Sequence, residues 1–129
     1  MARYEAHLQC PGLELGAQQQ VVQKLATAVG VELTWLDRRN ASMGLLLAPQ
    51  GLSVRVLLEC QANGEITMLL SGREGMGKGA PQSRACFEHL LALLLELLPA
   101  AQVMFRSDRD GPIRGSTATR AITSPQEVR

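Results

Sequence analysis

Residues 72–79, Gly-Arg-Glu-Gly-Met-Gly-Lys-Gly, come closer than any other segment of this chain to a motif with known chemistry. Glycines at this spacing let successive backbone amides converge on an anion, and Lys78 would reach its outer phosphates. Arg73 and Arg84 add positive charge near the expected start of a helix, where anions bind favourably. The predicted anion-binding set is Arg73, Gly75, Gly77, Lys78 and Arg84.

The segment resembles the phosphate-binding loop of P-loop nucleotide hydrolases over these eight residues and departs from it just beyond. Gly79 stands where that loop has the Ser or Thr that binds magnesium, and Ala80-Pro81 delays the helix. The preceding strand belongs to an expected hairpin rather than to a parallel βαβ unit. An anion- or nucleotide-binding protein is therefore the alternative hypothesis, set against a glycine-rich connection that binds nothing.

Thiol and metal chemistry have weaker support. Cys86 and His89 are three residues apart in one expected helix, so they are neighbours on its surface and a nucleophile–base pair is conceivable. Cys86 lies on the apolar side, however, and no third residue that would orient His89 can be named. His7 and Cys10 are three apart on a strand, where side chains point to opposite faces. We expect no catalytic constellation, no metal site and no cofactor.

Composition excludes several classes of partner. Thirteen Lys and Arg against twelve Asp and Glu leave a net charge of +1, and one Trp, one Tyr and two Phe offer few rings to stack on bases, so nucleic acid is not expected. The charged amino terminus lacks the apolar stretch of a signal peptide, and no apolar run reaches the roughly 20 residues of a bilayer span. The three cysteines lack the spacing of a disulfide framework. These features predict a cytoplasmic protein with no membrane partner.

Apolar periodicity predicts the elements that position these side chains. Alternation predicts strands over 3–10, 31–37, 43–48, 52–60, 65–70 and 102–106, and a period of 3.6 predicts helices over 18–29 and 81–98. Asn63-Gly64 predicts a hairpin turn. The order strand, helix, four strands, helix, strand predicts an α+β fold, in which a mainly antiparallel sheet carries two helices packed on one face in two layers.

The chain length of 129 residues suits one domain. We assign residues 1–106 to a single α+β domain. Residues 107–129 hold two prolines, two glycines and only scattered apolar side chains, so they bury too little surface to offset the entropy of ordering. A flexible carboxyl-terminal tail is expected there.

The second helix is richer in leucine than one sheet face requires, because its apolar arc extends over roughly 200°. The excess that would need a protein partner or a second copy consists of Leu91, Leu94, Leu95 and Leu98. Another possibility stays open. The first helix, the tail or the strand over 102–106 could cover these side chains within one chain.

The order of elements from residue 18 to residue 98 is similar to that of the type III secretion chaperone-like proteins, which have an amphipathic helix, an antiparallel meander and a long leucine-rich helix. The resemblance rests on topology and includes no sequence motif. It implies dimerisation through the long helix and binding of client segments. We therefore expect a non-enzymatic protein-binding or chaperone-like module that forms a homodimer through its second helix.

Overall fold

A computed structural model describes residues 2–48, 51–74 and 80–107. Their elements, in chain order, are β1 (Ala2–Gln9), α1 (Leu15–Val29), β2 (Thr34–Trp35), β3 (Asn40–Leu47), β4 (Leu52–Cys60), the 3-10 turn η1 (Ala62–Gly64), β5 (Glu65–Gly72), α2 (Pro81–Leu97) and β6 (Gln102–Arg106). This order of strands and helices is the predicted one. Of the tail expected over 107–129, residues 108–129 lie outside the described part of the chain.

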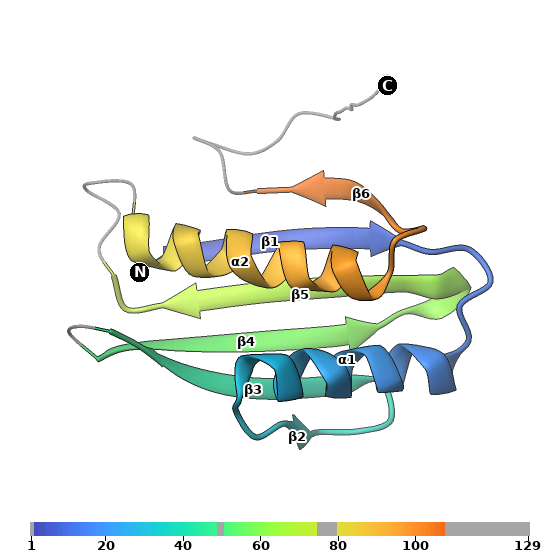
Figure 1. Cartoon of the computed structure of the whole chain (residues 1–129), viewed down its shortest axis with the longest axis horizontal. Coiled ribbons are helices and arrows are strands. Elements are labelled where there is room, and N and C mark those ends of the chain that lie inside the picture. Colours follow the sequence, from blue (N-terminus) through green and yellow to red (C-terminus); the bar gives the residue numbers. More distant parts are fainter. Residues whose placement is uncertain (1, 49–50, 75–79, 108–129) are drawn as a thin grey trace.

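The six strands form one antiparallel sheet with the spatial order β2-β3-β4-β5-β1-β6. Strands β2 to β5 follow one another as a meander, whereas β1 lies between β5 and β6. Both helices cover the same face of the sheet, with α1 over β3 and β4 and α2 over β1 and β5 (Figure 1). The predicted two-layer α+β fold is therefore confirmed.

The core lies between the sheet and the two helices. Alternate residues of the three central strands, β1, β4 and β5, face the helices and are buried. Each helix packs against them with a stripe of buried residues at helical spacing. The Phe87 ring of α2 packs against the Tyr4 ring of β1, with 5.5 Å between their centroids. Each large apolar side chain buried in this way contributes about 1.5–3 kcal/mol to the hydrophobic stabilisation. The alternation seen in the sequence thus sets which face of the sheet is covered.

Several predicted boundaries differ from the observed ones, and for α1 and β2 the hydrogen bonds show the reason. Helix α1 begins at Leu15, three residues before the predicted start, because the amide of Gln18 already donates to the carbonyl of Glu14 at 2.9 Å. Strand β2 is only two residues long, because the chain turns directly after it. The Asp37 carboxylate accepts the backbone amides of Arg39 and Asn40 at 2.7 and 2.8 Å and holds that turn.

In the part of the chain that the structure describes, neither helix is both long enough and apolar enough to span a lipid bilayer.

Candidate functional site

The start of α2 is the place where the sequence predicted an anion site. Arg73 directly follows β5, Arg84 lies on the first turn of α2, and both are exposed. Gly75, Gly77 and Lys78 lie outside the described residues. Helix α2 has no local side-chain cap, since Ala80 precedes it with φ 45° and Pro81 opens it. A capping group must therefore come from elsewhere in the chain.

The carboxylate of Glu74 supplies that cap. Its Oε1 accepts the backbone amide of Ser83 at 2.7 Å, and its Oε2 accepts that of Gln82 at 3.1 Å. Burial acts to raise the pKa of Glu74, but the hydrogen bonds from Ser83 and Gln82 outweigh it and hold the pKa below its usual value. An anion bound to these two amides would first have to displace Glu74. Sequence reasoning missed this residue because it lies seven positions before Pro81, farther than any capping motif reaches.

The four leucines predicted to bind a partner have different environments in the structure. Leu91, Leu94 and Leu98 are 2%, 0% and 7% exposed, so the core of a single chain already covers them. Leu95 is half-buried. Two leucines outside the predicted set, Leu93 and Leu97, are half-buried as well and pack at the border of the core. The surface that α2 leaves for a partner therefore comes from the flanks of its apolar stripe.

Helical geometry separates these flanks. At 100° per residue, Leu95 and Glu88 lie on one side of the buried stripe, and Cys86, Leu93 and Leu97 lie on the other. The first side faces β6, because a guanidinium nitrogen of Arg106 pairs with the Glu88 carboxylate at 2.9 Å. The line Cys86–Leu93–Leu97 therefore faces α1.

The flanks of α1 can be assigned in the same way. Gly16, Gln19, Gln20 and Gln23 face the edge strand β2, where they line a surface groove of about 750 Å³. The opposite flank faces α2 and consists of Ala17, Val21, Ala28 and the exposed Lys24. The helices thus enclose a mostly apolar strip, which we call the interhelix valley. Its apolar members are Cys86, Leu93 and Leu97 from α2 and Ala17, Val21 and Ala28 from α1, and the exposed Lys24 of α1 borders it.

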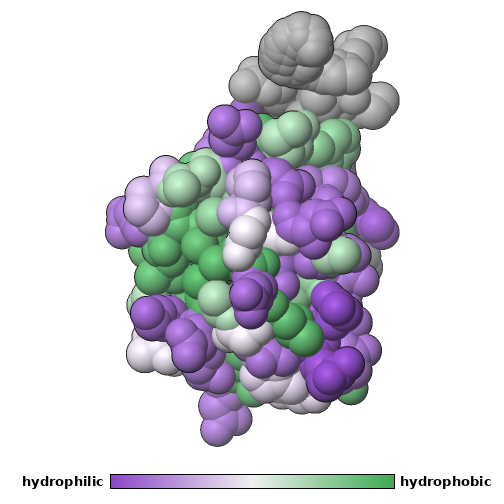
Figure 2. Space-filling view, turned by 90° about the vertical axis from the view of Figure 1, so that its right-hand side faces the viewer, coloured by the Kyte–Doolittle hydropathy of each residue, from purple (hydrophilic) through white to green (hydrophobic). Residues whose placement is uncertain are grey.

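An end view of the molecule agrees with this distribution. In Figure 2, hydrophobic side chains gather on the half that carries the helices, and hydrophilic side chains dominate the half formed by the other face of the sheet. The helix side of the molecule therefore offers apolar surface to a partner, whereas the uncovered face of the sheet offers polar surface.

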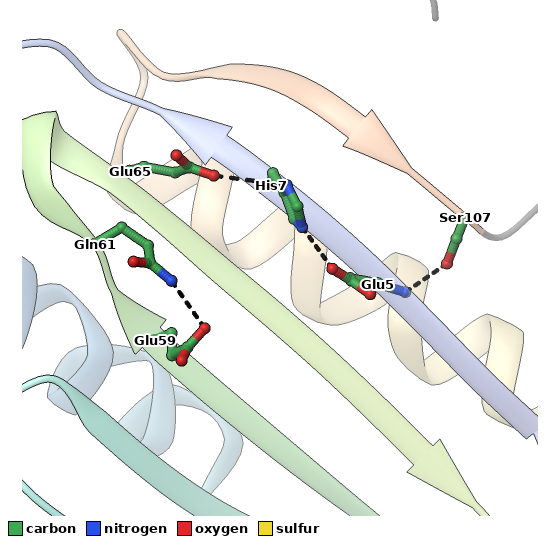
Figure 3. A network of polar contacts seen from close by, with 6 residues as sticks. All are labelled: Glu5, His7, Glu59, Gln61, Glu65 and Ser107. Carbon is green, nitrogen blue, oxygen red and sulfur yellow. Dashed lines mark hydrogen bonds and ion pairs between the residues drawn. The ribbon is translucent and has the colours of Figure 1, made fainter. Parts of the chain in front are cut away.

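The uncovered face of the sheet carries a network of polar contacts (Figure 3). His7 of β1 lies between two carboxylates, with Nε2 at 2.5 Å from Glu5 and Nδ1 at 3.5 Å from Glu65 of β5. Its ring also contacts that of Phe105 on β6, at 5.0 Å between centroids. The Ser107 hydroxyl accepts the backbone amide of Glu5 at 2.7 Å. These contacts join β5, β1 and β6, so the carboxylates and the imidazole stabilise the pairing of these strands.

Cys60 and Cys86 do not have the environment of reactive nucleophiles. Burial raises the pKa of the Cys86 thiol, which is the opposite of what a thiolate nucleophile needs. Burial likewise raises the pKa of Cys60, against a smaller lowering by the Arg39 guanidinium. All three cysteines are free thiols. Within the described residues, no three His, Cys, Asp or Glu side chains are grouped to hold a metal ion.

Sequence reasoning also missed the groove beside α1. Its lining combines three glutamines of the helix with Trp35, Asp37 and Arg38 of the segment around β2. These two segments come together only because α1 lies on the β3–β4 side of the sheet. The one available signal was the chain's single tryptophan in a short, polar-flanked strand.

Comparison of the chain with models of known protein families gives no match, and comparison with curated proteins gives none either.

Proposed function

We propose that this protein is a non-enzymatic, chaperone-like protein-binding module that self-associates through α2, as its similarity in element order to the type III secretion chaperone-like proteins implies. The observation that carries the proposal is the interhelix valley. Cys86, Leu93 and Leu97 stay half-buried along α2 although they follow one another at helical spacing. Apolar side chains in such a line lose contact with water when a second surface covers them.

The α1 side of the valley suits a close approach. Ala17 and Ala28 are small, Val21 between them is 8% exposed, and the flexible side chain of the exposed Lys24 lies on the same flank. Small residues on one side and leucines on the other allow side chains of a second copy to insert between the helices. Because a twofold dimer uses the same patch on both subunits, each copy would supply the leucines that fill the partner's valley.

The test is the mass of the protein in solution, measured by sedimentation velocity over a range of concentrations. The wild type is expected to form a dimer, and Leu93→Ser combined with Leu97→Ser is expected to give a folded monomer. Leu95→Ser is the matched control, because it makes the same change on the half-buried flank that faces β6. Circular dichroism verifies that every variant is folded. A monomeric wild type, or dissociation by Leu95→Ser alone, would refute self-association through the valley.

Anion binding remains the alternative function, and the same protein can be used to test it. Pyrophosphate added to the wild type would have to compete with Glu74 for the amides of Gln82 and Ser83. Under this alternative, Glu74→Ala frees the two amides and should bind pyrophosphate more tightly, whereas Lys78→Ala should abolish binding. Amide NMR spectra that stay unchanged with millimolar pyrophosphate in all three proteins would exclude the alternative.

A further inference from the structure

The groove beside α1 lies on the side of that helix away from the interhelix valley. It is an open surface groove with a volume of about 750 Å³, accessible to an extended chain. One wall is the amino-terminal half of α1 and the other is the segment around β2. Its lining residues are Gly16, Gln19, Gln20, Gln23, Trp35, Asp37 and Arg38.

Two of the lining side chains, those of Gln19 and Asp37, make hydrogen bonds that hold the walls of the groove in place. The Gln19 side-chain amide donates to the carbonyl of Arg38 at 2.7 Å and ties α1 to the turn after β2. The Asp37 carboxylate accepts two backbone amides and the side-chain amide of Asn40, at 2.7 to 3.0 Å. These hydrogen bonds, that from the Asn40 side chain above all, hold the pKa of Asp37 below its usual value. The Asp37 carboxylate therefore stays ionised, and its oxygens are occupied by hydrogen bonds within the turn.

Other lining groups have no partner in the described part of the chain. Among residues 2–48, 51–74 and 80–107, no hydrogen bond or ion pair involves the side-chain amides of Gln20 and Gln23, the guanidinium of Arg38 or the indole N–H of Trp35. The groove therefore offers two groups that both donate and accept and two further donors, one of which, the Arg38 guanidinium, makes no ion pair with a described residue.

Backbone groups at the edge of the sheet add to these side chains. Strand β2 is the outermost strand beside β3, so one side of it has no neighbour among the described residues. The amide of Leu36 points toward β3, where it donates to the carbonyl of Asn40 at 2.8 Å. Because direction alternates along a strand, the backbone N–H and C=O of Trp35 point outward. The Trp35 ring is 36% exposed beside them.

We propose that this groove binds an extended peptide segment that carries an acidic side chain next to an apolar one. The backbone of the segment pairs with the outer edge of Trp35, its apolar side chain packs on the indole, and its carboxylate pairs with Arg38. Gln20 and Gln23 match the alternating donors and acceptors of a peptide. The inference rests on the proposed function as a protein-binding module and assigns the class of segment that it captures.

Trp35 is the only tryptophan of the chain, so its fluorescence reports on this groove alone. The probe is an amino-acetylated, carboxyl-amidated hexapeptide of alternating Val and Asp, titrated against the full-length protein. A hexapeptide with Asn in place of Asp is the neutral control. We expect a saturable change in Trp35 emission, with the Asp peptide bound about fivefold more tightly than the Asn peptide.

Position 16 supplies a pair of variants that should both fold. A Cβ built at Gly16 meets nothing within 4 Å, so both Gly16→Ala and Gly16→Glu fit. A carboxylate in the first turn of a helix also favours folding. Gly16→Glu should bind the Asp peptide about tenfold more weakly than Gly16→Ala, because the added carboxylate competes for Arg38 and repels the ligand. Arg38→Gln should abolish the preference for Asp over Asn.

Three results would overturn the inference. They are an unchanged Trp35 spectrum at millimolar peptide, equal affinity for the two peptides, and equal binding by the two variants at position 16. A response to neutral oligosaccharides but not to peptides would overturn it in favour of a carbohydrate site. Self-association is measured separately by sedimentation, so a failed valley and a failed groove are distinguishable.

Discussion

Replacement of Gln18 by methionine tests whether a buried hydrogen bond anchors α1. Gln18 is 1% exposed, and its side-chain Nε2 donates to the carbonyls of Gln61 and Glu65, both at 2.9 Å. The Glu65 carbonyl also accepts the backbone amide of Gln61 at 2.7 Å. The change to methionine keeps the length of the side chain but leaves the Gln61 carbonyl without that donor.

The expected loss follows from these contacts. Leaving a buried acceptor without its donor costs about 1–3 kcal/mol, and the methionine thioether recovers about 1 kcal/mol of apolar burial. The net destabilisation of Gln18→Met should therefore be about 1–2 kcal/mol. For a domain of this size that lowers the unfolding midpoint by roughly 5–10 °C.

The neighbouring residue provides the control. Gln19 makes the same type of bond, from its side-chain amide to the carbonyl of Arg38 at 2.7 Å, but at an exposed position where water can replace it. Gln19→Met should cost less than about 0.5 kcal/mol. Urea unfolding followed by circular dichroism measures both. Equal destabilisation by the two variants would show that burial of the Gln18 amide does not govern its contribution.

Three further predictions concern the turn after β4, the cap of α2 and the thiols. Gly64→Ala should destabilise the fold by about 3 kcal/mol in urea unfolding, because φ is +79° and a Cβ would lie 2.0 Å from a backbone oxygen; Gly51→Ala, with φ +71° and open space, should cost about 1 kcal/mol. The pKa of Glu74 is lowered in the folded state, so the contribution of this carboxylate to stability is present at neutral pH and is lost as pH falls below about 5. The unfolding temperature of Glu74→Gln should therefore change less between about pH 5 and pH 3 than that of the wild type. Because burial raises the pKa of Cys60 and Cys86, both should react slowly with a thiol reagent at pH 8 in the folded protein and rapidly in urea; fast reaction of both in the folded state would contradict their burial.

The fold was predictable where local patterns decide. Strict alternation predicted β4 and β6 with their observed bounds, and Pro81 with Pro99 bracketed α2. The Asn63-Gly64 pair does adopt positive φ at both residues, 63° and 79°. What the sequence could not reveal is the insertion of β1 between β5 and β6, because pairing between distant strands leaves no periodic signal.

The cap of α2, the valley and the groove were harder to predict from the sequence, because they too depend on pairing between distant segments. A wide leucine arc predicts an excess of apolar surface, but only the packing shows that Leu94 faces the core and Leu93 its border. Glu74 caps a helix across a loop, and Trp35 meets the glutamines of α1 only in three dimensions. Each of these arrangements depends on contacts between segments far apart in the chain.

The place of β1 in the sheet has a consequence for synthesis on the ribosome. Strand β1 is synthesised well before both of its neighbours in the sheet, since β5 begins at Glu65 and β6 at Gln102. The meander of β3, β4 and β5 can pair as it emerges, but the amino-terminal strand must wait for its partners. Until translation passes residue 106, one edge of β1 has no partner strand, and the nascent chain exposes the backbone groups that the finished sheet covers.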